Sequence, residues 1–156
     1  VLWRGWCEHD VPTSEFCWQS QGGQQVLTAV LPWGYGCAKW LPTASQELAE
    51  KLPPILAKQG RFSATNHLLP PTGHDQSPFE SAVPGALEKL NASQSEYQFR
   101  RSSFSDFFAA LRDDEHTLPV LRGELLSPKY MRIHRGIFST RMDIKQLNAS
   151  LEQFVS

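Results

Sequence analysis

The sequence predicts an α/β fold in which short strands alternate with helices around a parallel sheet. Short apolar segments that are typical of strands recur along the chain. Between them lie segments whose apolar residues recur every three or four positions, which is the spacing of a helix face. The chain has 156 residues, 40% hydrophobic and 20% charged, which suits one domain with a sizeable core. Because strand–helix–strand connections join parallel strands, we expect helices that cross over a parallel sheet.

The first half of the chain contains two predicted strands with a helix between them. Val26–Trp33 is β-branched and apolar, so it predicts a strand that leads into a loop. Ser45–Lys58 has apolar residues along one helical face, and Pro53 and Pro54 must kink or split that helix because each ring removes a backbone donor. His67–Pro70 predicts a short strand that stops at the second of two prolines.

Helices dominate the second half of the chain. Ser77 can cap a helix, Pro78 suits its first position, and Glu80 completes a capping box. Ser103 caps a later helix that we expect to bury its three phenylalanines and Leu111. The predicted elements are, in order, a helix over Ser77–Leu90, a strand over Tyr97–Arg100, a helix over Phe104–Arg112, a strand over Pro119–Gly123 and a helix over Ser139–Phe154.

Composition excludes several classes of partner. Fifteen basic and sixteen acidic residues give a net charge of −1, so the chain has no electrostatic reason to bind nucleic acid or a membrane surface. No apolar run approaches the roughly 20 residues that span a bilayer. The three cysteines Cys7, Cys17 and Cys37 match no zinc or redox spacing, so we expect reduced thiols and a cytoplasmic protein.

A histidine between two arginines marks the segment Lys129–Lys145. His134 lies between Arg132 and Arg135, with no acidic residue within three positions on either side. Neutral imidazole is a common zinc ligand, and open zinc sites take ligands from distant segments. The spacing leaves two interpretations open, a metal ligand or a solvated histidine near a helix N-terminus.

Five stretches of the chain resemble one enzyme family. In chain order they are WRG, EFCWQS, LPWGYGCAKWLP, LPPTGHDQSP and KYMRIHRGIFSTRMDIK, which begin at Trp3, Glu15, Leu31, Leu69 and Lys129. Together they are similar to glycoside hydrolase family 38, the zinc-dependent retaining α-mannosidases. The resemblance is strongest to the bacterial mannosylglycerate hydrolases, and it covers the chain from end to end.

The resemblance implies how the chain is organised. Residues 1–127 would form the later β/α units of a parallel-stranded catalytic barrel, and residues 128–156 would begin the helical middle domain with the first helix of a three-helix bundle. Enzymes of the family are several times longer, so we expect an internal piece of a larger enzyme. The rest of the parent catalytic domain would then be a partner of this piece.

Asp75 matches the acid/base residue of the family. Retaining glycosidases place two carboxyl groups about 5 Å apart, one as nucleophile and one as acid/base. Pro70 and Pro71 stiffen the approach to Asp75, and Gly73 lets the backbone pass close to a sugar. We expect apolar neighbours to desolvate the carboxyl group. The alternative interpretation is that Asp75 caps the helix predicted near Ser77.

His134 matches a zinc ligand of the family, and the other ligands are not in this chain. The family takes them from an N-terminal His-x-Asp motif and from the nucleophilic aspartate. No His-x-Asp occurs in the sequence, and the nucleophile's motif, an aspartate shortly before Phe-Gly, is also absent. By family order the nucleophile would precede Val1. We therefore expect Zn²⁺ to be held only in the complete enzyme, since one imidazole holds zinc weakly.

The resemblance also suggests which residues bind the sugar. Arg4 matches an arginine near the sugar site, although a surface salt bridge is an equal alternative. Tyr35 matches an aromatic residue that packs on the sugar, but the aspartate that usually follows is Gly36 here, so a carboxylate contact at that point is in doubt. Arg135, with Lys129 and Arg132, could hold a carboxylate or phosphate, or could form a solvated basic rim. Trp33 and Trp40 could stack on a ring, with core packing as the alternative for at least one.

The function that follows is hydrolysis of an α-mannoside with retention of configuration, within a larger zinc-dependent enzyme. Mannosylglycerate or its phosphorylated form is the expected substrate. The alternative is a non-catalytic carbohydrate-binding or interaction fragment. Open strand edges could also let this piece form a homo-oligomer.

Overall fold

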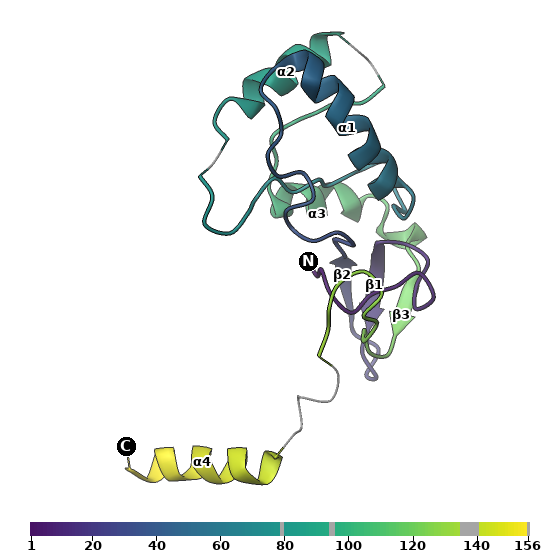
Figure 1. Ribbon diagram of the computed structural model, residues 1–156. Helices are drawn as coiled ribbons and strands as arrows, with labels where there is room; N and C mark the ends of the chain where they lie inside the picture. Colours follow the sequence, from purple (N-terminus) through teal and green to yellow (C-terminus); the bar gives the residue numbers. More distant parts are fainter. Residues whose placement is uncertain (79, 94–95, 135–140, 156) are drawn as a thin grey trace.

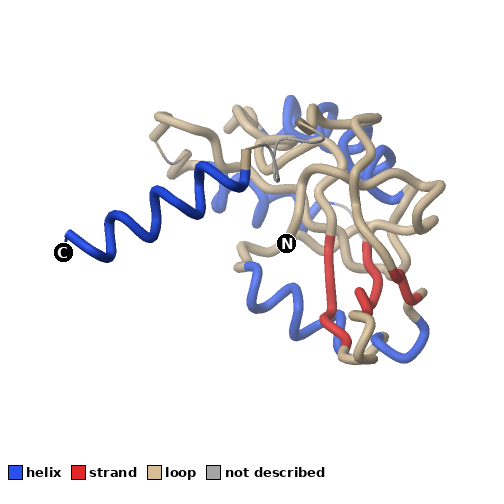
Figure 2. The backbone as a smooth tube through the Cα atoms, turned by 90° about the horizontal axis from the view of Figure 1, so that it is seen from below, coloured by secondary structure: helices blue, strands red, loops and turns tan. Residues whose placement is uncertain are grey.

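The computed structural model describes residues 1–78, 80–93, 96–134 and 141–155. Its sheet has three strands in the order β2-β1-β3, which lie side by side in Figure 2. The central strand β1 (Glu15–Gln19) pairs antiparallel with β2 (Gln25–Ala29) and parallel with β3 (Val120–Arg122). The expected α/β class is therefore confirmed, but the sheet is mixed rather than purely parallel.

The helices follow the predicted order. Helix α1 continues through Pro53 and Pro54, so the prolines do not split it. The described helices are α1 (Ser45–Gly60), α2 (Val83–Ser93), α3 (Phe104–Arg112), the short 3₁₀ helix η1 (Glu115–Thr117) and α4 (Met142–Val155).

Helix α2 begins later than its sequence signals predict. The predicted capping box at Ser77 does not start a helix, and the first residue of α2 is Val83. Pro84 then stands in the first turn, where its missing N–H costs no helical hydrogen bond.

Two predicted strands do not form. Residues 67–70 and 97–100 have no regular secondary structure. Phe99 instead pairs with the side chain of Asn91 in α2, with its N–H 2.8 Å from Oδ1 and its carbonyl oxygen 2.6 Å from Nδ2. A side chain thus satisfies the backbone groups that a neighbouring strand would have satisfied.

Helix α3 has the predicted capping box. The Ser103 side chain accepts a hydrogen bond from the Asp106 N–H, and the Asp106 carboxylate accepts one from the Ser103 N–H. Phe107 and Leu111 are buried as predicted, whereas Phe104 is 48% exposed. Phe104 is the first residue of the helix.

The core is divided between the helices and the sheet. One cluster packs α1 against α2, and these helices lie side by side in Figure 1. A second cluster lies at the sheet and surrounds Trp6, Phe16 and Phe62. Figure 1 shows that the N-terminal segment and the chain after β3 lie near each other at this sheet. Gly5 bridges Ser127 there, so the two segments are also hydrogen-bonded.

Helix α4 stands apart from these clusters. All its described residues are exposed, including the apolar Ile144, Leu147, Leu151 and Phe154. The helix is drawn away from the other elements in Figure 1.

Within the described ranges, no helix has both the length and the apolar character that a membrane crossing needs.

Candidate active site

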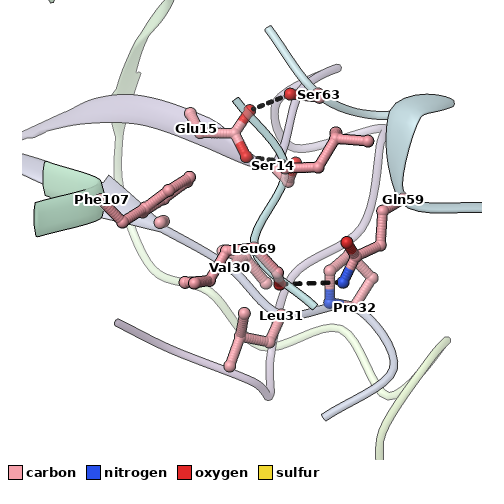
Figure 3. Close-up of a pocket in the computed structure, with 11 residues that line it drawn as sticks. Ser14, Glu15, Val30, Leu31, Pro32, Gln59, Ser63, Leu69 and Phe107 are labelled. Carbon is pink, nitrogen blue, oxygen red and sulfur yellow. Dashed lines mark hydrogen bonds between the residues drawn. The ribbon is translucent and has the colours of Figure 1, made fainter. Parts of the chain in front are cut away.

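A buried carboxylate anchors the segment that leads to Asp75. Glu15 on β1 accepts hydrogen bonds from Ser14 Oγ at 2.8 Å and from the Ala64 N–H at 2.7 Å. Ser63 Oγ also donates to this carboxylate, at 3.3 Å. Figure 3 marks the hydrogen bonds from Ser14 and Ser63. Burial raises the pKa of Glu15, and the hydrogen bonds from its neighbours oppose that rise. These contacts fix the chain just after α1.

A second anchor holds the same segment from α1. Gln59 Nε2 donates to the Leu69 carbonyl oxygen at 2.9 Å, a contact that Figure 3 also shows. Glu15 and Gln59 both line a cavity of about 20 Å³, which is the size of one water molecule. The segment is therefore held at both ends before it reaches Pro70.

The Asp75 loop lies against the turn that contains Tyr35. The Ala38 N–H donates to the Pro71 carbonyl oxygen at 3.0 Å. A Cβ atom on Gly36 would lie 3.1 Å from the Gly73 carbonyl oxygen, so the close approach favours glycine at that position. This approach gives a structural reason for Gly36 where the family usually has aspartate.

Tyr35 binds the carboxyl group of Asp75 directly. Its hydroxyl donates to Asp75 Oδ2 at 2.8 Å. Trp3 packs edge-on against the Tyr35 ring, with the centroids 5.3 Å apart. The hydrogen bond to Asp75 raises the pKa of Tyr35, and the charge of Arg4 opposes that rise. Asp75 and Tyr35, which the sequence analysis assigned to the site, are thus hydrogen-bonded to each other, and the charge of Arg4 acts on Tyr35.

Asp75 itself is exposed, so the expected desolvation by apolar neighbours is not found. The alternative that Asp75 caps a helix near Ser77 is also wrong, because α2 begins at Val83.

Arg4 forms no ion pair within the described residues, where Lys129–Glu8 is the salt bridge. The surface salt bridge that we considered for Arg4 therefore does not form there.

The segment before His134 is fixed against the N-terminal loop. Glu8 accepts hydrogen bonds from Lys129 Nζ and from the Tyr130 hydroxyl, the latter at 2.8 Å. These bonds, the one from Lys129 first, hold the pKa of Glu8 at about 2, below its usual 4.5. The Tyr130 ring also stacks on Trp6, with the centroids 5.5 Å apart. Lys129 is thereby paired within the chain and is not a free anion ligand.

The same segment passes close to Arg4. Gly5 has φ +87°, and a Cβ atom there would lie 2.2 Å from the Leu125 carbonyl oxygen, so only glycine fits. The same hypothetical atom would lie 3.4 Å from Ile133 Cδ1. Ile133 therefore lies beside the residue that follows Arg4, and His134 is the next residue along the chain.

His134 is exposed, and no described hydrogen bond or ring contact joins it to Asp75 or Tyr35. Throughout the described ranges, no three His, Cys, Asp or Glu residues gather closely enough to hold a metal ion. The residues present therefore do not fit a zinc ion by themselves. His134 precedes Met142, the first residue of helix α4, by eight positions. Arg135 lies outside the described residues.

The two tryptophans considered for sugar stacking differ in burial. Trp33 packs beside Phe62 and Tyr130 at the edge of the sheet cluster, so core packing is its role here. Trp40 is 60% exposed.

The structural roles of Glu8 and Glu15 were not predicted from the sequence. The isolated acidic residue in the apolar stretch Glu15–Trp18 was the signal for Glu15, whereas no sequence pattern pairs Glu8 with Lys129.

Known glycoside hydrolases resemble this chain in sequence and in fold. The profile of the glycosyl hydrolases family 38 N-terminal domain matches residues 5–124. A protein from Halalkalibacterium halodurans, called "Putative mannosylglycerate hydrolase", is 26% identical over 123 residues, which are 78% of this chain and 14% of that relative. The crystal structure of an alpha-mannosidase from Enterococcus faecalis V583 matches with a TM-score of 0.67 at 25% identity. That match covers 75% of this chain and 13% of the enzyme's chain.

Proposed function

The chain belongs to glycosyl hydrolase family 38, and from that premise we propose that it supplies the acid/base side of the active site of a larger α-mannosidase. The enzyme would cleave α-mannosides with retention of configuration. Because the chain spans 14% and 13% of the relatives that it matches, the rest of the catalytic domain would complete the site.

The hydrogen bond between Tyr35 and Asp75 carries this proposal. It holds an exposed carboxyl group in one orientation, with Oδ2 occupied and Oδ1 free of any described partner. An acid/base carboxyl must present one oxygen to the bond that is cleaved, and a fixed neighbour reduces the entropy lost in doing so. An exposed carboxylate on a loop that takes no part in catalysis does not need a neighbour that fixes its orientation.

Asp75 would transfer one proton in each half of the reaction. In the first half its carboxyl group gives a proton to the glycosidic oxygen as the bond between that oxygen and the mannose breaks. A nucleophilic carboxylate elsewhere in the enzyme forms a bond to the sugar at the same time. In the second half the Asp75 carboxylate takes a proton from water, which attacks the sugar and releases the nucleophile.

Around this carboxyl group we assign sugar contacts to Tyr35, Arg4 and Arg135. The Tyr35 ring is braced by Trp3 and so can offer a fixed surface to a sugar. Arg4 follows Trp3, whose ring packs against Tyr35, and the charge of Arg4 opposes the rise in the pKa of Tyr35. Arg135 retains its assignment from the family resemblance alone.

We propose mannosylglycerate or its phosphorylated form as the substrate. The name of the Halalkalibacterium relative supports this choice. Arg132 is exposed and has no described ion pair, so its charge is available to an anion. Lys129, which we also considered, is bound to Glu8.

For zinc we propose a site that exists only in the complete enzyme. His134 would be one ligand, and the remainder of the catalytic domain would supply the others, since the described residues do not hold a metal ion alone. The ion's chemistry would be Lewis-acid polarisation of the bound sugar.

We also propose how the chain is organised within the enzyme. Residues 1–127 would belong to a β/α barrel, and residues 128–156 would start a helical bundle. The enzyme would work in the cytoplasm.

Replacement of Asp75 by Asn in the complete enzyme tests this function. We expect kcat/KM to fall by about 100-fold or more for an alkyl mannoside, whose leaving group needs a proton. A dinitrophenyl mannoside needs none in the first half of the reaction, so bond cleavage should slow far less. Asp113→Asn, in an exposed loop, is the matched control and should affect neither substrate.

Equal activity of Asp75→Asn and the unaltered enzyme on the alkyl mannoside would refute the assignment of Asp75. If the unaltered enzyme hydrolyses neither mannoside yet binds mannose, the alternative of a carbohydrate-binding fragment replaces the enzymatic one.

A further inference from the structure

Three side chains gather beside Asp75 without a role in the proposed reaction. Lys39 Nζ lies over the Trp40 ring, 4.1 Å from its centroid. The Trp40 and His74 rings meet at 84°, with the centroids 5.3 Å apart. His74 directly precedes Asp75 in the chain, so this group lies next to the proposed acid/base residue.

The backbone holds this group in place. Lys39 N–H donates to the Gly36 carbonyl oxygen at 3.1 Å, which closes the turn that begins near Tyr35. A Cβ atom on Gly36 would lie 3.5 Å from Lys39 Cδ and 3.8 Å from His74 Nδ1. Lys39 and His74 therefore approach each other over a glycine that leaves room for both.

Trp40 is held in an unusual conformation. Its φ is +55°, in the left-handed region that non-glycine residues rarely adopt. Lys51 Nζ from α1 donates to the Trp40 carbonyl oxygen, so the helix stabilises that conformation. The ring is nevertheless 60% exposed. Strained backbone beside an exposed tryptophan is typical of a binding surface rather than of core packing.

No carboxylate among the described residues neutralises the charge of this group. Lys39 forms no ion pair with any carboxylate in the described ranges. Lys39 is half-buried, and its ammonium group lies over an aromatic ring and near an imidazole, an arrangement that suits an anion such as a carboxylate or phosphate. The adjacent exposed indole offers apolar surface to the carbon atoms that carry the anion.

The position relative to Asp75 indicates which part of the substrate this group meets. An acid/base carboxyl reaches the oxygen that joins the sugar to its aglycone. Its neighbours therefore contact either the sugar or the aglycone, and Tyr35 and Arg4 are already assigned to the sugar. We infer that Lys39, Trp40 and His74 form a subsite for an aglycone that carries a carboxylate or phosphate group. This inference rests on the proposed function.

Lys39→Met in the complete enzyme tests the subsite. The measured quantity is the ratio of kcat/KM for mannosylglycerate to kcat/KM for mannosylglycerol, two substrates that differ in the charge of the aglycone. We expect the ratio to fall about tenfold or more, because a charge-assisted contact to the aglycone is lost. Lys39→Arg should restore most of the ratio.

Lys58→Met is the matched control. Lys58 Nζ also lies over a tryptophan ring, 4.6 Å from the Trp33 centroid, but it belongs to α1 and not to the group beside Asp75. Its loss should leave the ratio unchanged. If Lys39→Met unfolds the protein, His74→Gln takes its place and should also lower the ratio.

The outcomes separate the subsite from the proposed function. Equal loss of activity on both substrates, or no loss on either, would overturn the subsite while the mannosidase assignment stands. Failure of the unaltered enzyme to hydrolyse either substrate would overturn both.

Discussion

At the scale of single residues, the pair formed by Tyr35 and Asp75 determines what the site can do. The Tyr35 hydroxyl donates to Asp75 Oδ2, and this bond raises the pKa of Tyr35, so the hydroxyl keeps its proton at neutral pH. The phenol therefore remains a donor in both halves of the proposed reaction. Its task would be to hold the carboxyl group rather than to exchange protons with it.

Tyr35→Phe isolates that task, because it removes the hydroxyl and leaves the ring against Trp3. We expect kcat/KM in the complete enzyme to fall about tenfold for an alkyl mannoside, which corresponds to a hydrogen bond of about 1.4 kcal/mol. The loss should be smaller for a dinitrophenyl mannoside, whose departure needs no proton.

Tyr130→Phe is the matched control, since it also removes a phenol that donates to a carboxylate, in this case Glu8. It should not change the relative rates for the two mannosides. The same loss on both substrates for Tyr35→Phe would contradict a positioning role, because general disruption of the fold affects both.

Individual site residues could be predicted only from the family resemblance. GHDQ and WGYG selected Asp75 and Tyr35, but no sequence pattern shows that these side chains, 40 positions apart, form a hydrogen bond. That contact depends on the approach of the Gly36 turn to the Gly73 backbone. The exposure of Asp75 was not predicted because apolar neighbours in sequence do not cover it in space.

At the scale of elements, helices could be predicted better than strands. Helix α1 and helix α3 have long apolar faces or a clear cap, and both were predicted almost to the residue. The runs at 67–70 and 97–100 are too short for periodicity to separate a strand from an extended loop. Strand β1 was missed, although the glycines after it and the apolar residues of β2 suggest a hairpin.

The segment around Phe99 shows why an extended run need not join a sheet. Asn91 from α2 takes both of its backbone groups. Asn91→Ala should therefore lower the free energy of unfolding of the chain by about 1–3 kcal/mol, because partly buried backbone groups lose their partner. Chemical denaturation followed by circular dichroism measures this change.

Asn148→Ala gives the comparison for Asn91→Ala. Asn148 is an exposed residue of α4, and we expect its replacement to cost less than about 0.5 kcal/mol. Equal effects of the two replacements would show that the Asn91 contacts do not order the segment near Phe99.

At the scale of the whole molecule, the chain has the fold of part of a larger enzyme. A match with a TM-score of 0.67 to an alpha-mannosidase covers 75% of this chain and 13% of that enzyme's chain. The exposed apolar residues of α4 are what a bundle helix shows without its neighbours. The barrel and the bundle are proposals for the complete enzyme.

The central claim is that Asp75 and His134, far apart in the sequence, serve one sugar-binding pocket. A crystal structure of the complete enzyme with a thio-linked α-mannoside tests it most directly. We predict that Asp75 Oδ1 lies about 3 Å from the linking sulfur, with Oδ2 still bound to Tyr35, and that the imidazole of His134 faces the same mannose. Placement of these two side chains on different faces of the enzyme, with the mannoside beside only one of them or beside neither, would contradict the claim.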